Sequence, residues 1–240
     1  MLRTMNNNSI NDTTVENQAL VLEIIGPAGS GKTTLLKALS RRHKKIQQGT
    51  HPSKIRQIPF FISNTFSLLP IYLRQYRHSR WFTWRETRSM AYLGAGLQVF
   101  QQQASNNDAV VVLDHGPIYR LAFLRALGPD ITTSQSYMNW WVNLLNKWIA
   151  TLDMLIWLDA PNAILLDRIR SRHTKHAIKE KCKEEGYEFL TRYRTFLAQT
   201  ISDSVSDHRL LLLNFDTSKE TIEKIVDKIL LTFDSITNKA

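Results

Sequence analysis

The chain has 240 residues, of which 43% are hydrophobic and 22% charged, and its formal net charge of +10 corresponds to a pI near 9.8. These values exclude a chain that is mainly disordered or embedded in a membrane, and the length suits one α/β domain with a hydrophobic core. The positive charge predicts attraction to anions, among them nucleotide phosphates, an acidic acceptor or nucleic acid.

The first segment, residues 1–18, is polar and rich in Asn, and we predict a disordered tail before a single domain at residues 19–235. The tail lacks the apolar centre of a secretory signal. Cys182 is the only cysteine and cannot form an internal disulfide, which favours a reducing compartment and a cytoplasmic location. No window reaches the roughly 18 uninterrupted apolar residues of a transmembrane segment. The nearest run, residues 59–73, is interpreted as a buried strand and helix of the core; the alternative is a surface that contacts lipid or an apolar partner.

Apolar runs that end at a glycine or a polar residue predict the strands of a parallel sheet. Helical patterns follow the runs, so the order of elements favours an α/β fold in which helices cover both faces of the sheet. The helix after the third run is expected at residues 162–172, and the last helix at residues 218–233. A weaker strand is predicted near residues 55–62. The four stronger runs are residues 20–25, 109–113, 154–158 and 210–215.

Residues 54–103 contain many aromatic side chains and are interpreted as helices inserted at the edge of the sheet, where a small acceptor would bind. Three polar residues within this insertion, Arg85, Glu86 and Arg88, are candidates for contact with the acceptor. A salt-bridged surface helix explains them equally well. Residues 137–150 are predicted to form an amphipathic helix whose tryptophans pack in the core.

A glycine-rich segment follows the first strand and matches the phosphate-binding motif G-x-x-x-x-G-K-[ST] in full. Its backbone N–H groups would converge on an anion, and the next helix would add its positive dipole end. We expect Lys32 to reach the β- and γ-phosphates of ATP and the Thr33 hydroxyl to bind Mg²⁺. A glycine turn with a chance lysine is the disfavoured alternative. The nucleotide-binding candidates are Gly26, Pro27, Ala28, Gly29, Ser30, Gly31, Lys32, Thr33 and Thr34.

Two carboxylates end predicted strands, where parallel sheets bind their ligands. Asp114 is the candidate for chemistry: it would either contribute to the Mg²⁺ site or accept the proton of an attacking hydroxyl. The alternative for Asp114 is a cap on the following turn. For Asp159 we predict helix capping, and His115 is interpreted as a hydrogen-bonding residue without a chemical role.

A basic segment follows the third strong strand. On a helix, Arg168 and Arg172 share a face because they lie four residues apart, whereas Arg170 points elsewhere. Such a pair would clamp the phosphoryl group during transfer, since planar guanidinium groups neutralise charge on its oxygens. The alternative is a solvated basic helix end.

The segments GPAGSGKTT, LDHG, WLDA with LLDRIRSR, and EGYEFLTRYRTFL together resemble the thymidylate kinase and deoxynucleoside kinase group of P-loop kinases. The similarity in layout extends over residues 20–233, and the P-loop is its specific part. It implies a three-layer P-loop NTPase fold with a mostly parallel five-stranded sheet, ATP as donor and an Arg-rich lid at about residues 168–186. Asp114 matches the acidic position of an Asp/Glu-Arg motif, but His115 stands where arginine is usual. The Arg-Glu-Pro-Gly-Gly segment of thymidylate kinases is absent.

Two functions are therefore compared. The first is an ATP-dependent kinase that acts on a small acceptor, with a nucleoside or nucleoside monophosphate favoured. The second is a regulatory P-loop ATPase or nucleotide switch that acts on a protein or nucleic-acid partner. Neither the Asn-Lys-x-Asp motif of GTPases nor the signature of ABC ATPases occurs in a suitable place. Nucleic-acid binding rests on charge alone and is not favoured. The oligomeric state is open, with a homodimer among the options.

Overall fold

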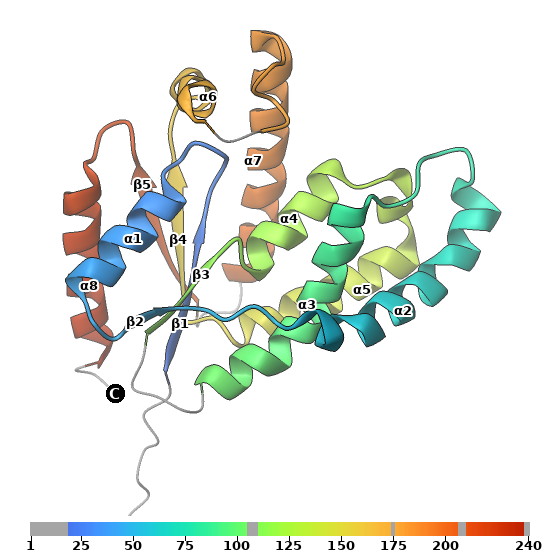
Figure 1. Ribbon diagram of the computed structural model, residues 1–240, viewed down its shortest axis with the longest axis horizontal. Helices are drawn as coiled ribbons and strands as arrows, with labels where there is room; N and C mark the ends of the chain where they lie inside the picture. The colour runs from blue at the N-terminus through green and yellow to red at the C-terminus, as the bar shows by residue number, and fades with distance from the viewer. Residues whose placement is uncertain (1–18, 105–109, 174–175, 206–209, 238–240) are drawn as a thin grey trace, which may run out of the picture.

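The computed structural model has one β-sheet between two layers of helices (Figure 1). It describes residues 19–104, 110–173, 176–205 and 210–237, so the predicted tail at residues 1–18 lies outside the described residues. The sheet order is β2-β3-β1-β4-β5, and every neighbouring pair of strands is parallel. The predicted α/β fold with a five-stranded sheet is confirmed. The strands are β1 Leu20–Ile25, β2 Ile46–Gln48, β3 Val110–Asp114, β4 Met154–Asp159 and β5 Leu211–Asp216.

The helices divide into two layers and an arm. Helices α1 and α8 cover one face of the sheet, α4 and α7 cover the other, and α2, α3 and α5 extend sideways from it (Figure 1). None of the helices in the described part of the chain is long and apolar enough to cross a membrane. The α-helices are α1 Lys32–Arg42, α2 Lys54–Ile71, α3 Trp84–Ala104, α4 Pro117–Leu127, α5 Gln135–Ile149, α6 Asn162–Ser171, α7 Lys183–Val205 and α8 Ile222–Thr237.

The sheet separates two hydrophobic cores because successive side chains of a strand point to opposite faces. In β1, Leu22 and Ile24 belong to the core with α1 and α8. Val21 and Ile25 belong to the core with α3, α4, α5 and α7. The tryptophans of α5 pack in this second core, as expected; Trp148 is fully buried there.

The strand predicted near residues 55–62 is wrong, because this segment lies within helix α2. The Ser53 hydroxyl caps the helix by accepting a hydrogen bond from the Arg56 N–H. The Ile and Phe residues of the segment favour a strand locally, but α2 packs along α3, where Leu68 is buried in the core. The fifth strand is instead β2, which pairs with β3 at the edge of the sheet.

The last helix begins at Ile222 rather than at Ser218. Thr221 marks its start, since the Thr221 carbonyl accepts from the Ile225 N–H and its hydroxyl accepts from the Lys224 N–H. Ser218 instead belongs to the turn after β5, where its N–H donates to the Asp216 carboxylate at 2.9 Å. The prediction therefore placed the start of the helix in this turn, four residues too early.

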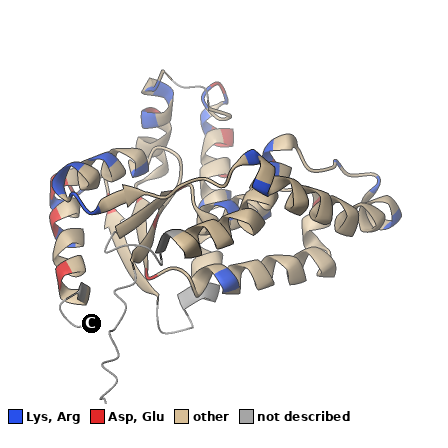
Figure 2. Ribbon diagram, turned by 60° about the horizontal axis from the view of Figure 1, so that its bottom comes forward, with Lys and Arg blue, Asp and Glu red and all other residues tan. Residues whose placement is uncertain are grey.

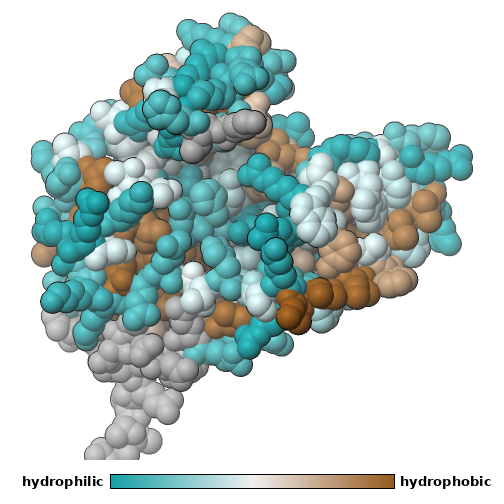
Figure 3. Space-filling view, viewed as in Figure 1, coloured by the Kyte–Doolittle hydropathy of each residue, from teal (hydrophilic) through white to brown (hydrophobic). Residues whose placement is uncertain are grey.

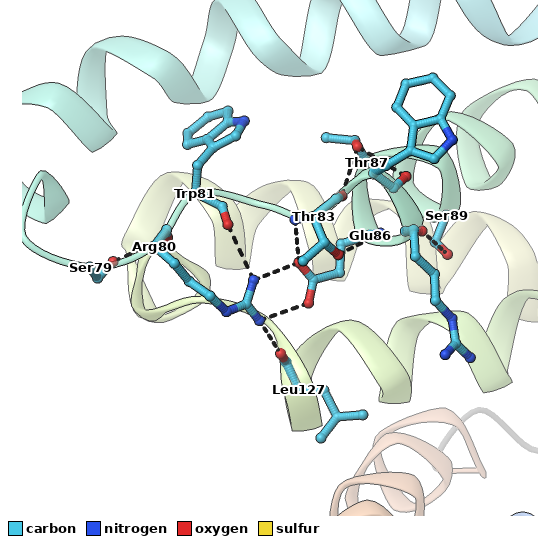
Figure 4. Close-up of polar contacts among 10 residues, drawn as sticks. Ser79, Arg80, Trp81, Thr83, Glu86, Thr87, Ser89 and Leu127 are labelled. Atoms are coloured by element: carbon cyan, nitrogen blue, oxygen red, sulfur yellow. Dashed lines mark hydrogen bonds and ion pairs between the residues drawn. The ribbon is translucent and has the colours of Figure 1, made fainter. Parts of the chain in front are cut away.

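An ion pair fixes the start of α3 and joins the arm to α4 (Figure 4). The two terminal nitrogens of Arg80 donate to the two carboxylate oxygens of Glu86, each at 2.8 Å, and Arg80 also donates to the Leu127 carbonyl. Glu86 accepts from the Thr83 N–H at 2.7 Å, and the Thr83 hydroxyl accepts from the Glu86 N–H, which is a capping box. Glu86 is only 3% exposed, so it acts in the fold and does not line the cavity between α2, α3 and α4.

We expect Glu86→Gln to lower the free energy of unfolding by about 2 kcal/mol, because Arg80 and the Thr83 N–H lose a charged, buried acceptor. Glu185→Gln is the matched control: it breaks the exposed 3.4 Å pair with Lys181 and should cost less than about 0.5 kcal/mol. Chemical denaturation measures both variants. Equal losses would show that the buried pair stabilises the protein no more than a surface pair does.

Candidate functional site

The glycine loop at residues 26–31 joins β1 to α1 and lies against the end of β4 and against α6. Gly26 has φ 141° and Gly29 has φ 87°, values that favour glycine. A Cβ at Gly26 would lie 2.0 Å from the Leu158 carbonyl oxygen, and one at Gly29 would lie 2.7 Å from that of Leu165. No side chain caps α1, so its first N–H groups are left for an anion.

Lys32 lies over this loop and is 6% exposed. Its Nζ donates to the Gly26 and Pro27 carbonyl oxygens at 2.8 and 2.9 Å. Burial lowers the pKa of Lys32 to about 8, although Asp114 opposes the shift. The Ser30 hydroxyl is buried within the loop and has no hydrogen-bond partner in the described part of the chain. A phosphate chain would satisfy these groups, so the residues fit a nucleoside triphosphate.

The Thr33 hydroxyl donates to an Asp114 carboxylate oxygen at 3.1 Å, which joins the start of α1 to the end of β3. Burial raises the pKa of Asp114, but contacts with His115, Lys32 and Thr33 outweigh burial and hold the pKa below its usual value. The carboxylate is therefore ionised at neutral pH. A hydroxyl and a carboxylate are oxygen ligands suited to Mg²⁺ that also binds phosphate, so this pair fits the ion.

The turn after β3 is strained at His115, whose φ is 56°. The His115 Nδ1 lies 3.0 Å from an Asp114 oxygen, in a contact that lacks hydrogen-bond alignment. Its ring meets the Tyr119 ring edge-to-face, with centroids 4.5 Å apart. At Gly116 an added Cβ would lie 2.7 Å from the Glu23 carboxyl carbon. This turn therefore presents His115 beside the proposed metal ligand.

Glu23 is a site residue that the sequence analysis missed. It is fully buried in β1, and its two carboxylate oxygens accept from the Ile118 and Tyr119 N–H groups at 2.8 and 2.9 Å. Glu23 thereby caps α4, and burial raises its pKa to about 8. One signal was available: an acidic residue in the middle of the apolar run LVLEII. The contact fixes the first turn of α4, which carries Tyr119 and Arg120.

A cavity of about 450 Å³ lies between α2, α3 and α4, and we call it the acceptor cavity. Two guanidinium groups are held in its wall by aromatic rings: Arg120 lies 3.9 Å from the Tyr92 ring, and Arg85 lies 4.5 Å from the Phe123 ring. Among the described residues, none that lines the cavity has a carboxylate. The polar and charged residues that line the cavity are His51, Lys54, Gln57, Arg85, Arg88, Ser89, His115 and Arg120.

The candidate lid arginines lie in different surroundings. Arg168 donates to the Thr217 hydroxyl and carbonyl, both at 2.9 Å, and to the Gly29 carbonyl at 3.4 Å. It thus connects the turn after β5 to the glycine loop. Helix α6 ends at Ser171, and Arg172 is the extended residue after it, so the prediction that both arginines share one helical face is wrong. After burial itself, the charge of Arg172 contributes to the lowered pKa of Lys32.

Asp159 does not cap α6, which corrects the prediction. Its two carboxylate oxygens accept from the Arg194 guanidinium at 2.7 and 2.9 Å, and one of them also accepts from the Ala160 N–H. Helix α6 begins after Pro161 without a side-chain cap. Asp159 therefore ties the end of β4 to α7, and Arg194 is a partner that sequence spacing did not indicate.

Comparisons with known proteins support the fold. No protein-family model matches the chain, and no curated protein matches its sequence. Among solved structures, thymidylate kinase from Candida albicans is similar, with a TM-score of 0.55 and 14% identity over 93% of this chain and 94% of that chain. Deoxyadenosine kinase from M. mycoides is also similar. Its structure with bound dCTP has a TM-score of 0.51 and 15% identity, over 90% of this chain and 100% of the other.

The same deoxyadenosine kinase with bound dATP gives a TM-score of 0.51 and 17% identity, over 88% of this chain and 98% of the other. The matches extend over 88–93% of this chain and 94–100% of the other chains. At such low identity they establish the architecture and not the substrate. The chain thus has the fold of the P-loop nucleotide and nucleoside kinases.

Proposed function

We propose that this chain is a phosphotransferase that moves the γ-phosphoryl group of ATP, with Mg²⁺, to a small acceptor in the acceptor cavity. One observation carries the proposal: the turn after β3 belongs to both halves of the site. Asp114 contacts Thr33 of the glycine loop, whereas the next residue, His115, lines the acceptor cavity. A donor on the loop and an acceptor in the cavity would meet at this turn. The fold shared with the two kinases supports this proposed phosphotransferase activity. We also propose a cytoplasmic location.

The lining of the cavity favours an anionic acceptor. Lys54, Arg85, Arg88 and Arg120 line it without a carboxylate, so an acceptor phosphate would offset their mutual repulsion. Within the nucleoside or nucleoside monophosphate class, we therefore favour the monophosphate. The aromatic walls suit a flat base, which stacks on rings without needing charge.

The residues would divide the chemistry as follows. The loop N–H groups and Lys32 bind and orient the phosphates, and Thr33 with Asp114 would hold Mg²⁺, which neutralises charge on the phosphate oxygens when bound. The low pKa of Asp114 makes it a better metal ligand than proton acceptor. Arg172, which is near Lys32, is the better candidate for the charge that develops during transfer, because Arg168 is already engaged in three hydrogen bonds.

A screen of nucleosides, nucleoside monophosphates and small alcohols for acceptor-dependent ADP release tests the proposal. Release that requires one of the monophosphates supports it. Release that no small acceptor stimulates, but that a protein or nucleic acid does, supports the alternative regulatory ATPase or nucleotide switch. No observation in the described residues favours that alternative over the kinase.

ATP affinity should depend on pH through Lys32. Its pKa near 8 means that the amine is charged below this value and neutral above it, so binding should be strong at pH 7 and weaken above pH 8. We expect the Kd for ATP to rise roughly tenfold per pH unit in the alkaline range. Titrations between pH 7 and 9.5 measure it, and Lys37→Ala, which changes an exposed lysine of α1, should show the same profile. A flat profile would mean that the Lys32 charge does not hold the phosphates.

For Asp114→Asn we expect ATP to bind still, while phosphoryl transfer falls by about 10²–10⁴-fold. Raising the Mg²⁺ concentration should recover part of the rate if the carboxylate holds the ion, and none if it accepts a proton. Single-turnover kinetics at several Mg²⁺ concentrations distinguish the two roles. An unchanged rate together with a lower melting temperature would instead make Asp114 a purely structural residue.

Replacing the two candidate lid arginines, Arg168 and Arg172, should have different effects. Arg172→Ala should slow transfer by about 10²-fold and change ATP affinity little, since its charge acts on the transition state. Arg168→Ala should lower ATP affinity and the free energy of unfolding by about 1–2 kcal/mol, because the turn at Thr217 loses its link to the glycine loop. Arg170→Ala, on the same helix, is the control and should leave the rate and the ATP affinity close to wild type. A slower rate in Arg168→Ala with unchanged stability would make Arg168 a clamp as well.

A further inference from the structure

Helix α2 has an exposed apolar stripe along one face. Its members are three or four residues apart, and this spacing places them in one row. Figure 3 shows part of the row as a brown band over α2. We call these residues the α2 stripe; it continues into the π-helix at Tyr72–Tyr76. Its members, with their exposed fractions, are Ile55 78%, Ile58 52%, Ile62 47%, Phe66 73%, Leu69 37% and Leu73 59%.

The α2 stripe lies outside the buried core, so the prediction that residues 59–73 form a buried strand and helix is wrong: within this run only Leu68 is in the core. The opposite face of α2 packs against α3, with Leu68 4% exposed and Phe60 in contact with Gly94. The buried contacts between α2 and α3 are therefore made by the face of α2 opposite the stripe. Single exposed apolar residues are ordinary, but a continuous row of this length marks a surface that binds something.

The arm is also strongly basic. Its cations flank the α2 stripe: Arg56 lies near the first end and Arg74 near the second, and both are exposed. Between residues 52 and 104 the only acidic residue is Glu86, which is buried against Arg80. Figure 2 shows Lys and Arg along the arm. The Lys and Arg residues of this segment are Lys54, Arg56, Arg74, Arg77, Arg80, Arg85 and Arg88.

An apolar hollow of about 330 Å³ opens from the α2 stripe. It lies between Ile55, Ile58 and Phe61 of α2 and the first turns of α3, where Trp84 forms one wall. Trp84 is 71% exposed and its ring lies 5.8 Å from that of Phe61. An exposed tryptophan beside a row of apolar side chains is typical of the boundary between water and lipid.

We propose that the α2 stripe docks this protein on the surface of an anionic lipid bilayer. The apolar row would enter the boundary between headgroups and acyl chains, and the flanking cations would contact acidic headgroups. A second copy of the chain fits less well. Parallel pairing of two α2 helices would bring Lys54 and Arg56 against their own copies, and antiparallel pairing would bring them toward Arg74 of the π-helix; α2 has no acidic residue to offset either contact.

Vesicle sedimentation with the full chain tests the proposal. We expect the protein to sediment with vesicles of phosphatidylcholine and phosphatidylglycerol, at least about tenfold more strongly than with phosphatidylcholine alone. Binding should weaken as salt is raised from 0.1 to 1 M, because salt screens the cations. A protein that stays in the supernatant with both kinds of vesicle overturns the proposal.

Two pairs of variants separate the apolar and the electrostatic parts. Ile62→Asp with Phe66→Asp should abolish binding. Leu231→Asp should not, because Leu231 is also exposed, at 69%, but lies on α8. Circular dichroism verifies that each variant is folded. Retention of vesicle binding by the Ile62/Phe66 variant would show that the α2 stripe is not the surface used.

Arg56→Gln with Arg74→Gln should weaken partitioning on the order of 30-fold, and Lys37→Gln with Arg41→Gln, on α1, should have little effect. If the Arg56/Arg74 variant and the Lys37/Arg41 variant weakened vesicle binding equally, the cations of the arm would not be the ones that contact the lipid headgroups. Sedimentation velocity without vesicles tests the second copy: a dimer that the Ile62/Phe66 variant converts to a monomer would assign the α2 stripe to self-association instead.

Discussion

The buried side chain of Glu23, in the strand before the glycine loop, links the nucleotide-binding half of the site to the half that contains the acceptor cavity. Glu23 accepts hydrogen bonds from the Ile118 and Tyr119 N–H groups in the first turn of α4. These bonds fix the position of α4 relative to β1. Burial favours the neutral form of the Glu23 carboxyl group and raises its pKa to about 8, while the two N–H donors oppose that shift. Because β1 leads directly into the glycine loop, the same contact sets the distance between the loop and the helix that forms one wall of the acceptor cavity.

The charged side chains differ between the donor side and the acceptor side of the site. On the donor side, Lys32 is the buried cation and Asp114 the ionised acid, joined to Thr33 through one hydrogen bond. On the acceptor side the described lining contains cations and no carboxylate, and aromatic rings contact the guanidinium groups of Arg85 and Arg120. Such a lining binds an anion more tightly than a neutral molecule. The Arg80–Glu86 pair keeps α3, and hence Arg85 and Arg88, in position.

Local patterns in the sequence predicted the strands and the helices after the loop, because apolar runs and the glycine motif are short-range signals. The predictions were wrong or incomplete where contacts between distant parts of the chain determine the secondary structure or the partner of a side chain. The segment at residues 55–62 has strand-like composition and becomes helical by packing on α3. Asp159 looks like a cap locally, yet it binds Arg194, 35 positions away. Glu23 has its partners 95 and 96 positions away, and no local pattern names them. The roles of the site residues stay predictions until they are measured.

The fate of the γ-phosphoryl group tests the central claim most directly. Excess enzyme is mixed with ATP labelled at the γ-phosphate and with a set of nucleoside monophosphates, and the products of a single turnover are separated. We expect the label to appear in a new nucleoside diphosphate, and to stay in ATP when Lys32 is replaced by Ala. Label that appears as inorganic phosphate, at a rate that no small acceptor changes, would contradict transfer between the glycine loop and the acceptor cavity.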